Sequence, residues 1–203
     1  MMGKLFVVSA PSGAGKTSLV RALLVERPNL VVSVSHTTRK PRAHEVEGRD
    51  YHFVSVGQFE QLVGQGAFLE HARVFDNYYG TGAQQVRAQL ADGKDVILEI
   101  DWQGARQIRA AQPDCVSIFI LPPSRMALQQ RLRERRTDSD QAIARRLQDA
   151  VGDMTHYREF DYVVINDRFE QAVRDLACIL DGKGTKLASS RAELAPLVEE
   201  LLR

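Results

Sequence analysis

The sequence contains little cysteine, no long apolar run and almost no excess of one charge. Its two cysteines, Cys115 and Cys178, lie far apart and outside any CxxC pair, which argues against a disulfide framework. The five histidines show no spacing typical of a zinc site. No segment approaches the roughly 18 consecutive apolar residues of a membrane-spanning helix, and none resembles a targeting peptide. The formal net charge of +1 lacks the basic excess of a nucleic-acid-binding domain. We therefore expect a cytoplasmic protein that binds neither membranes nor nucleic acid.

What the chain does have is a regular alternation of short apolar runs and amphipathic segments. This pattern is typical of a parallel sheet flanked by helices, and runs this apolar suit strands covered on both faces. With 203 residues, 44% of them hydrophobic, the chain is expected to form one domain with a sizeable core. We predict an α/β, three-layer fold around a five-stranded parallel sheet. The predicted core strands are Leu5–Ser9, Leu30–Val34, Val96–Ile100, Val116–Leu121 and Tyr162–Ile165.

Two segments interrupt this alternation and are interpreted as insertions. Residues 35–82 hold two further strand candidates, Tyr51–Val54 and Phe68–Phe75, around a short helix at Gln58–Val63, which indicates a mixed α/β lobe. Residues 124–158 are typical of two helices. The remaining core would comprise about residues 4–34, 83–123 and 159–181.

The tail follows this domain, which spans residues 4–181. Within residues 182–203, a Gly/Lys/Ser-rich linker leads into a final short helix with one apolar face. That helix either docks on its own domain or forms a contact in a homo-oligomer, and the sequence leaves both interpretations open.

A glycine-rich segment follows the first predicted strand and opens a helix. It fits the Walker A pattern GxxxxGK[ST], except that Ala10 stands at the position of the first glycine. Glycines allow backbone N–H groups to point at phosphate oxygens, and the helix N-terminus favours an anion. In this pattern Lys16 reaches the transferred phosphate of ATP, and the hydroxyl of Thr17 binds Mg²⁺. The predicted ATP-binding loop comprises Ala10, Pro11, Ser12, Gly13, Ala14, Gly15, Lys16 and Thr17.

This loop alone is compatible with a GTPase, an ATPase or a kinase. The NKxD motif by which signalling GTPases read guanine is absent, and a motor ATPase would need a much longer chain. A second anion site instead follows the second strand, on the side where open α/β sheets bind ligands. Arg39 and Arg42, held apart by Pro41, suit a phosphate dianion, and Tyr51 and Tyr79 supply hydroxyl donors. A second anion site is what a kinase requires for its acceptor.

Several long motifs resemble those of guanylate kinases, most closely the bacterial enzymes. They are APSGAGKT, SHTTRKPRAHEVEGRDYHF, FLEHARVFDNYYGT, LEIDWQGARQ, RLRERRTDSDQAIARRL and YVVIND, in family order over about residues 4–180. The resemblance implies a P-loop NTPase-type fold with an inserted GMP-binding lobe and a helical lid. It also implies an ATP:GMP phosphotransferase that uses Mg²⁺, transfers the γ-phosphoryl group of ATP to GMP or dGMP, and gives ADP and GDP.

The resemblance further implies which residues bind GMP. A carboxylate such as Glu70 accepts hydrogen bonds from the N1–H and N2–H₂ donors of guanine, and hydroxyls from Ser35 and Thr81 donate to O6. Asp101 either reads guanine or serves Mg²⁺ through water, and the sequence does not separate these roles. The family pattern places the GMP phosphate on Arg39, Arg42, Tyr51 and Tyr79, with Glu45 steadying the arginines.

An arginine-rich stretch supplies the expected lid. Charge spreads over the equatorial oxygens of a moving phosphoryl group, and arginines on a closing lid stabilise it. By resemblance, Arg131, Arg135 and Arg146 are these arginines, Arg135 also stacks on adenine, and Asn166 contacts adenine.

Particular residues argue against two rival interpretations. Guanylate-kinase-like domains also occur as non-catalytic interaction modules, but these typically lose loop or lid residues that are present here, among them Lys16 and Arg146. A kinase for another monophosphate, such as AMP or TMP, is disfavoured by Glu70 and the paired hydroxyls.

Overall fold

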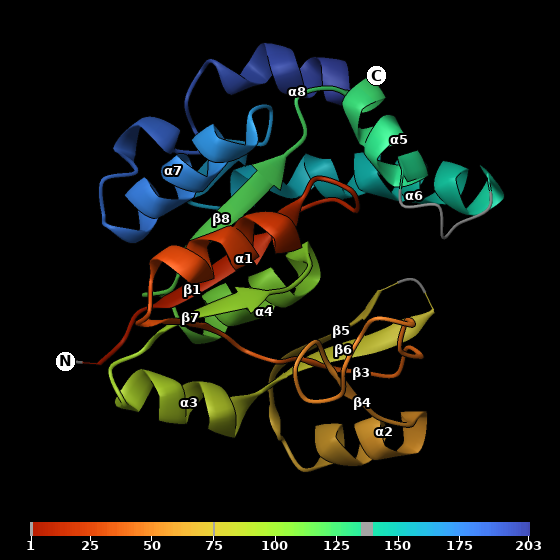
Figure 1. Ribbon diagram of the computed structural model, residues 1–203, viewed down its shortest axis with the longest axis vertical. Coiled ribbons are helices and arrows are strands. Elements are labelled where there is room, and N and C mark those ends of the chain that lie inside the picture. The colour runs from red at the N-terminus through yellow and green to blue at the C-terminus, as the bar shows by residue number, and fades with distance from the viewer. Residues whose placement is uncertain (1, 75, 135–139) are drawn as a thin grey trace. The chain divides into compact units, whose positions relative to one another are not determined.

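The computed structural model describes residues 2–74, 76–134 and 140–203. The chain divides into two compact units, one of Met1–Val7 and Asn29–Val116, the other of Val8–Pro28 and Ser117–Arg203. Figure 1 labels the helices and strands of both units.

The predicted five-stranded parallel sheet is confirmed, in the order β2-β7-β1-β8-β9. Its registers pair Val31 with Val96 and Leu121 with Ile165, both in parallel. All five side chains of β1 are buried, as expected for a strand covered on both faces. The predicted bounds were wrong for two strands, because β2 ends two residues earlier and β7 begins and ends one residue earlier than predicted. The strands are β1 (Leu5–Ser9), β2 (Leu30–Val32), β7 (Asp95–Glu99), β8 (Val116–Leu121) and β9 (Tyr162–Ile165).

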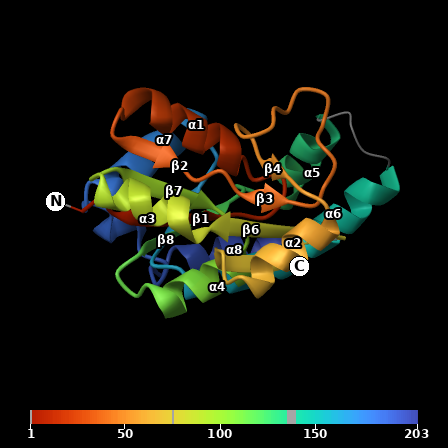
Figure 2. The same cartoon turned by 90° about the horizontal axis from the view of Figure 1, so that it is seen from below.

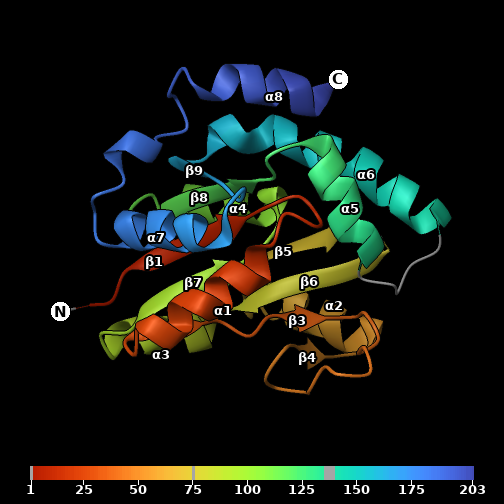
Figure 3. The same cartoon turned by 45° about the horizontal axis from the view of Figure 1, so that its top comes forward.

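The unit that contains the glycine-rich loop is mostly helical outside β8 and β9. Its helices α1 and α7 pack together, and α6 packs against both α5 and α8; Figure 3 shows α8 beside α6. Its elements are α1 (Lys16–Glu26), α5 (Arg125–Glu134), α6 (Asp140–Met154), the 3₁₀ helices Thr155–Glu159 and Thr185–Leu187, α7 (Phe169–Leu180) and α8 (Leu194–Leu202).

The last helix uses its apolar face within its own unit. Leu194, Val198 and Leu201 are buried, and α8 packs on α6. Upstream of it, the Nη1 atom of Arg191 donates to the carbonyls of Val163 and Leu187, which anchors the tail to β9. These contacts agree with docking on the helix's own domain, while self-association stays a prediction.

The other unit carries a second sheet, of four strands in the order β4-β3-β6-β5. Ser55 and Gln58 form a capping box that starts α2, and the ring of Phe59 stacks on those of Phe68 and Tyr78 at 4.8 and 5.5 Å between centroids. Figure 2 shows α2 lying over this sheet. The elements are β3 (His36–Thr37), β4 (His52–Phe53), α2 (Val56–Gly64), β5 (Phe68–Val74), β6 (Asn77–Gly82), α3 (Ala83–Ala91) and α4 (Trp102–Ala111).

Within the described residues, no helix combines the length and the hydropathy that crossing a bilayer requires.

Candidate active site

The glycine-rich loop turns sharply between β1 and α1. Gly13 and Gly15 have φ angles of 94° and 96°, in the left-handed region that side chains disfavour, and the amide of Ala14 donates to the carbonyl of Pro11 at 3.1 Å. Gly15 is the N-cap of α1. The loop therefore ends at a helix N-terminus, as an anion-binding loop requires.

The loop also needs its glycines because other elements approach it closely. A Cβ at Gly13 would lie 3.0 Å from the side chains of Leu128 and Leu132 on α5, and a Cβ at Gly15 would overlap the amide nitrogen of Asn166. Asn166 is buried, and its Nδ2 atom donates to the carbonyl of Ala14 at 2.7 Å. Asn166 thus lies against the loop, and its predicted contact with adenine stays a prediction.

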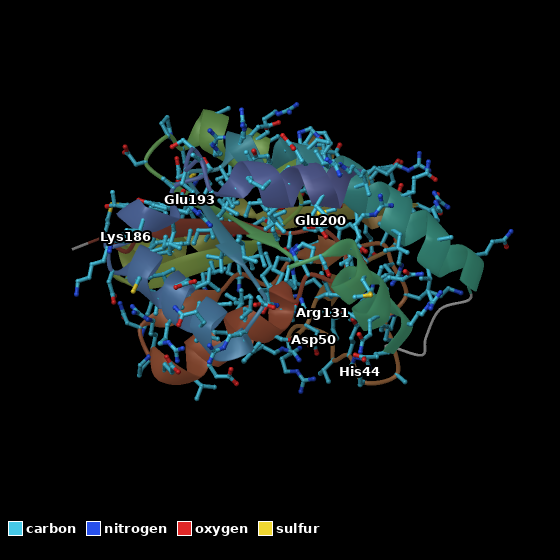
Figure 4. All side chains as sticks on the ribbon, turned by 90° about the horizontal axis from the view of Figure 1, so that it is seen from above. His44, Asp50, Arg131, Lys186, Glu193 and Glu200 are labelled. Carbon is cyan, nitrogen blue, oxygen red and sulfur yellow. The ribbon has the colours of Figure 1, made fainter. Side chains whose placement is uncertain are left out.

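Arg131, labelled in Figure 4, presents an unsatisfied guanidinium. Its Nη2 atom donates to the carbonyl of Asn166 at 2.8 Å, while its Nη1 atom is buried with no hydrogen-bond partner in the part of the chain that the structure describes. Because an unpaired buried N–H is costly, this atom suits an anionic ligand such as a phosphate oxygen.

The other predicted donor-side residues with described positions lie on two helices, α1 and α6. Lys16 is half-buried and Thr17 exposed in the first turn of α1, and Arg146 is half-buried on α6. Arg135 lies outside the described residues.

In the other unit, Glu45 forms a bidentate ion pair with Arg39. Nη1 and Nη2 of Arg39 donate to the two carboxylate oxygens at 2.9 and 2.8 Å, and the amide of Arg42 donates to the same carboxylate at 2.7 Å. Burial alone would raise the pKa of Glu45, but these hydrogen bonds outweigh it and hold the pKa below its ordinary value. Glu45 therefore fixes the orientation of the Arg39 guanidinium, and the guanidinium of Arg42 lies 3.8 Å from the same carboxylate.

The two predicted phosphate-binding tyrosines lie near this arginine. The ring centroids of Tyr51 and Tyr79 are 6.0 Å apart, and the guanidinium carbon of Arg39 lies 5.3 Å from the centroid of Tyr51. Burial, with smaller contributions from Tyr79 and Glu99, raises the pKa of Tyr51 to about 12. The Tyr51 hydroxyl therefore stays protonated at neutral pH and can donate to a phosphate.

Glu70 and Thr81 form a buried polar pair on neighbouring strands. They face each other in the register of β5 and β6, and the hydroxyl of Thr81 donates to Oε1 of Glu70 at 2.6 Å. Only 3% of Glu70 and none of Thr81 is exposed. A carboxylate buried in this way can recognise paired N–H donors, because water does not compete for it.

Asp101 and Ser35 complete the predicted acceptor residues. Asp101 caps α4, because its Oδ1 atom accepts from the amide of Gly104 and its Oδ2 atom from the side chain of Gln103, each at 3.0 Å. Ser35 is half-buried directly before β3, where its carbonyl accepts from the amide of His52 at 2.9 Å.

The structure also brings residues to Glu70 that the sequence reasoning did not single out. Gly104 and Gln107, on α4, both contact β5. The sequence signal for Gly104 was its place in the motif LEIDWQGARQ, where a glycine shortly after a predicted strand does not end a helix. In the described ranges, no group of three or more His, Cys, Asp or Glu side chains could hold a metal ion.

Comparisons with known proteins point to one family. A family model described as guanylate kinase matches residues 2–183. A guanylate kinase of Chromohalobacter salexigens is 58% identical over 200 residues, covering 98% of this chain and 93% of that protein. One of Methylococcus capsulatus is 54% identical and covers 98% of both chains. The crystal structure of guanylate kinase from Anaplasma phagocytophilum is similar at a TM-score of 0.75 and 33% identity, covering 98% of this chain and 94% of that one.

Proposed function

The chain belongs to the guanylate kinase family, and on this premise we propose that it transfers the γ-phosphoryl group of ATP to GMP, giving ADP and GDP. The observation that carries the choice of acceptor is the buried carboxylate of Glu70 beside the hydroxyl of Thr81. We extend the proposal to dGMP as a second acceptor and to the cytoplasm as the place of action.

Guanine recognition rests on the polarity of this pair. Guanine presents N1–H and N2–H₂ as adjacent donors, which the Glu70 carboxylate accepts, whereas adenine would leave this carboxylate without those donors. The Thr81 hydroxyl carries one proton, which it donates to Glu70 here. A donation from Thr81 to guanine O6 therefore requires that the hydroxyl turn away from Glu70 when GMP binds, while Ser35 provides a second hydroxyl.

The GMP phosphate is proposed to bind Arg39, Arg42, Tyr51 and Tyr79. Two guanidinium groups and two tyrosine hydroxyls supply charge and directed donors to a dianion. Glu45 pre-orients Arg39, so that less entropy is lost when the phosphate arrives.

On the donor side, the backbone of residues 10–17 and Lys16 would bind the phosphates of ATP, with Asn166 against the loop and near adenine. Thr17 is an exposed residue, and its hydroxyl is an oxygen ligand of the kind that Mg²⁺ prefers. For Asp101 the proposal keeps two alternatives, binding to guanine or binding to Mg²⁺ through water. When bound, Mg²⁺ would neutralise charge on the β- and γ-phosphates.

The chemistry we propose is a direct, in-line transfer without a covalent enzyme intermediate. An α-phosphate oxygen of GMP forms the new bond to the γ-phosphorus of ATP, and the bond from that phosphorus to the bridging oxygen of ADP breaks. Lys16, Arg131, Arg135 and Arg146 neutralise the charge that spreads over the transferred group. Positioning and charge neutralisation supply most of the rate, so no dedicated general base is needed.

A coupled ADP-release assay over GMP, dGMP, AMP, UMP and TMP tests this function. We expect turnover with GMP and dGMP, and at most about a thousandth of the GMP value of kcat/KM with AMP, because adenine does not present the adjacent N–H donors that the buried carboxylate accepts from guanine. Absence of turnover with every monophosphate would favour a non-catalytic binding module. Preference for AMP, UMP or TMP would overturn the assignment of Glu70.

A further inference from the structure

Helix α4 lies against strand β5, and two of its residues contact β5 at or next to Glu70. Neither residue is among those proposed to bind substrate. One is Gly104 in the first turn of the helix, and the other is Gln107, one turn later. Residues three apart on a helix lie on the same face, so Gly104 and Gln107 both lie on the face that meets β5.

At Gly104 the Glu70 carboxylate occupies the space of a side chain. A Cβ built on Gly104 would overlap the Oε2 atom of Glu70, while the amide of Gly104 donates to the cap residue Asp101. Glycine inside a helix costs about 1 kcal/mol relative to alanine. The local preference of the helix therefore favours alanine, and the position of Glu70 favours glycine.

The side-chain amide of Gln107 forms hydrogen bonds with the backbone of β5, as a neighbouring strand would. Its Oε1 atom accepts from the amide of His71 at 3.2 Å, and its Nε2 atom donates to the carbonyl of His71 at 2.8 Å. These bonds fix the backbone of the residue that directly follows Glu70. They do so next to an irregularity in the register between Phe68 and Glu70, of the kind that re-aims a side chain.

We propose that Gly104 and Gln107 are positioning residues for guanine recognition, acting through the Glu70 carboxylate. The inference rests on the proposed function. Thr81 holds Oε1, Gly104 leaves room for Oε2, and Gln107 fixes the backbone beneath them. Because the atom that a new Cβ would meet is the end of a flexible side chain, alanine at position 104 displaces the carboxylate rather than the helix.

The variant Gly104→Ala tests this directly, with Gly57→Ala as the matched control. Gly57 also lies in the first turn of a helix of the same unit, and nothing lies within 4 Å of a Cβ there. For Gly104→Ala we expect KM for GMP to rise about tenfold or more, with KM for ATP within about twofold of wild type. The melting temperature should be unchanged or higher, because alanine favours the helix. The control should leave both KM values unchanged.

The ratio of GMP to inosine monophosphate turnover identifies the group that has moved. Inosine monophosphate lacks the 2-amino group, so a displaced Glu70 should cost GMP more, and the kcat/KM ratio should fall about fivefold in Gly104→Ala. Gln107→Ala should change KM for GMP and this ratio in the same direction by smaller factors.

A purely structural role for Gly104 predicts the opposite set of results. KM for GMP within about twofold of wild type, or equal losses for GMP and ATP with a lower melting temperature, would overturn the inference. A crystal structure of Gly104→Ala with Glu70 in its wild-type position would overturn it too, whichever substrate the enzyme uses. Failure of the wild-type chain to phosphorylate GMP would instead count against the proposed function.

Discussion

At Gly15, the absence of a side chain decides the shape of the phosphate loop. Its φ of 96° costs an L-residue about 1–2 kcal/mol, and a Cβ there would meet the buried amide of Asn166. We therefore expect Gly15→Ala to lower the free energy of unfolding by about 1–3 kcal/mol and to raise KM for ATP several-fold. Denaturant unfolding and initial rates at varied ATP measure both effects.

The control for this change is Gly152→Ala in α6, where a Cβ meets nothing within 4 Å and φ is ordinary. That variant should gain about 0.5–1 kcal/mol in the free energy of unfolding, because alanine favours the helix. If the two variants behaved alike, the conformation assigned to Gly15 would be wrong.

Glu45 is a second residue whose contacts organise a predicted binding site, that of the GMP phosphate. Its side chain is 8% exposed and that of Arg39 17%, so water competes little with the two-pronged ion pair. In Glu45→Gln the amide keeps one acceptor but loses the charge. We expect the free energy of unfolding to fall by about 1–3 kcal/mol and KM for GMP to rise, because Arg39 loses its orientation.

The exposed Glu60, on α2 of the same unit, provides a charge-matched control. Glu60→Gln should leave stability and KM for GMP unchanged. An unchanged KM for GMP in Glu45→Gln would show that Arg39 needs no support from this carboxylate.

At the scale of elements, the short parallel strands β3 and β4 place two histidines side by side. His36 pairs with His52 in the register, and their ring centroids lie 4.7 Å apart. Burial and the neighbouring His52 lower the pKa of His36 below its ordinary value, against a smaller opposing effect of Glu47. The Nδ1 atom of His36 is buried and has no hydrogen-bond partner among the described residues.

This pair predicts acid sensitivity in the four-stranded sheet. Because the folded pKa of His36 lies below the unfolded value of 6.5, the unfolded chain binds the proton more readily below about pH 6.5. The contribution of neutral His36 to the free energy of unfolding is fully present above that pH. It should be lost as the pH falls through the folded pKa. His36→Gln should flatten the dependence of the unfolding free energy on pH between about 7 and 5. An unaltered slope would remove His36 as its cause.

The exposed His44, labelled in Figure 4, provides the control. His44→Gln should leave the slope as in wild type.

How far the elements could be predicted depended on the strength of their patterns. The apolar strands β1, β7, β8 and β9 follow from the sequence because burial on both faces leaves a nearly continuous hydrophobic run. The predicted helix at Gln58–Val63 corresponds to α2. Strand β6, NYYGTG, was not predicted because two glycines and mostly polar or aromatic side chains hide its period.

In the candidate site, too, local motifs could be predicted and long-range contacts could not. The glycine-rich loop is a local motif and could be predicted from its spacing. The pairing of Glu70 with Thr81 depends on the register of β5 against β6, and the contact of Glu70 with Gly104 depends on how α4 packs on β5. Such long-range contacts leave no local pattern, so only family resemblance linked Glu70 and Thr81, and the glycine within LEIDWQGARQ marked position 104 without showing that it meets Glu70.

At the scale of the whole molecule, the family match ends at residue 183 but the fold continues. Beyond it, the amide of Ser189 donates to the carbonyl of Asp161, Arg191 bonds β9, and α8 buries three apolar side chains. Ending the chain after Lys183 should therefore lower the free energy of unfolding by at least about 3 kcal/mol. The midpoint of urea denaturation measures this loss.

Removing only the exposed Arg203 provides the control and should leave the midpoint in place. A chain ending at Lys183 with a wild-type midpoint would mean that α8 contributes no net stability.

The Gln107 side chain has one more consequence, which concerns crowded solutions rather than catalysis. Strand β5 is the outermost strand of the four-stranded sheet, and an outermost strand offers its backbone to strands of other molecules. By occupying both the N–H and the C=O of His71, the Gln107 amide interrupts that row of backbone groups in the middle of the strand. Removing this side chain would therefore make aggregation through β5 more favourable, and variants at position 107 are best compared at low protein concentration.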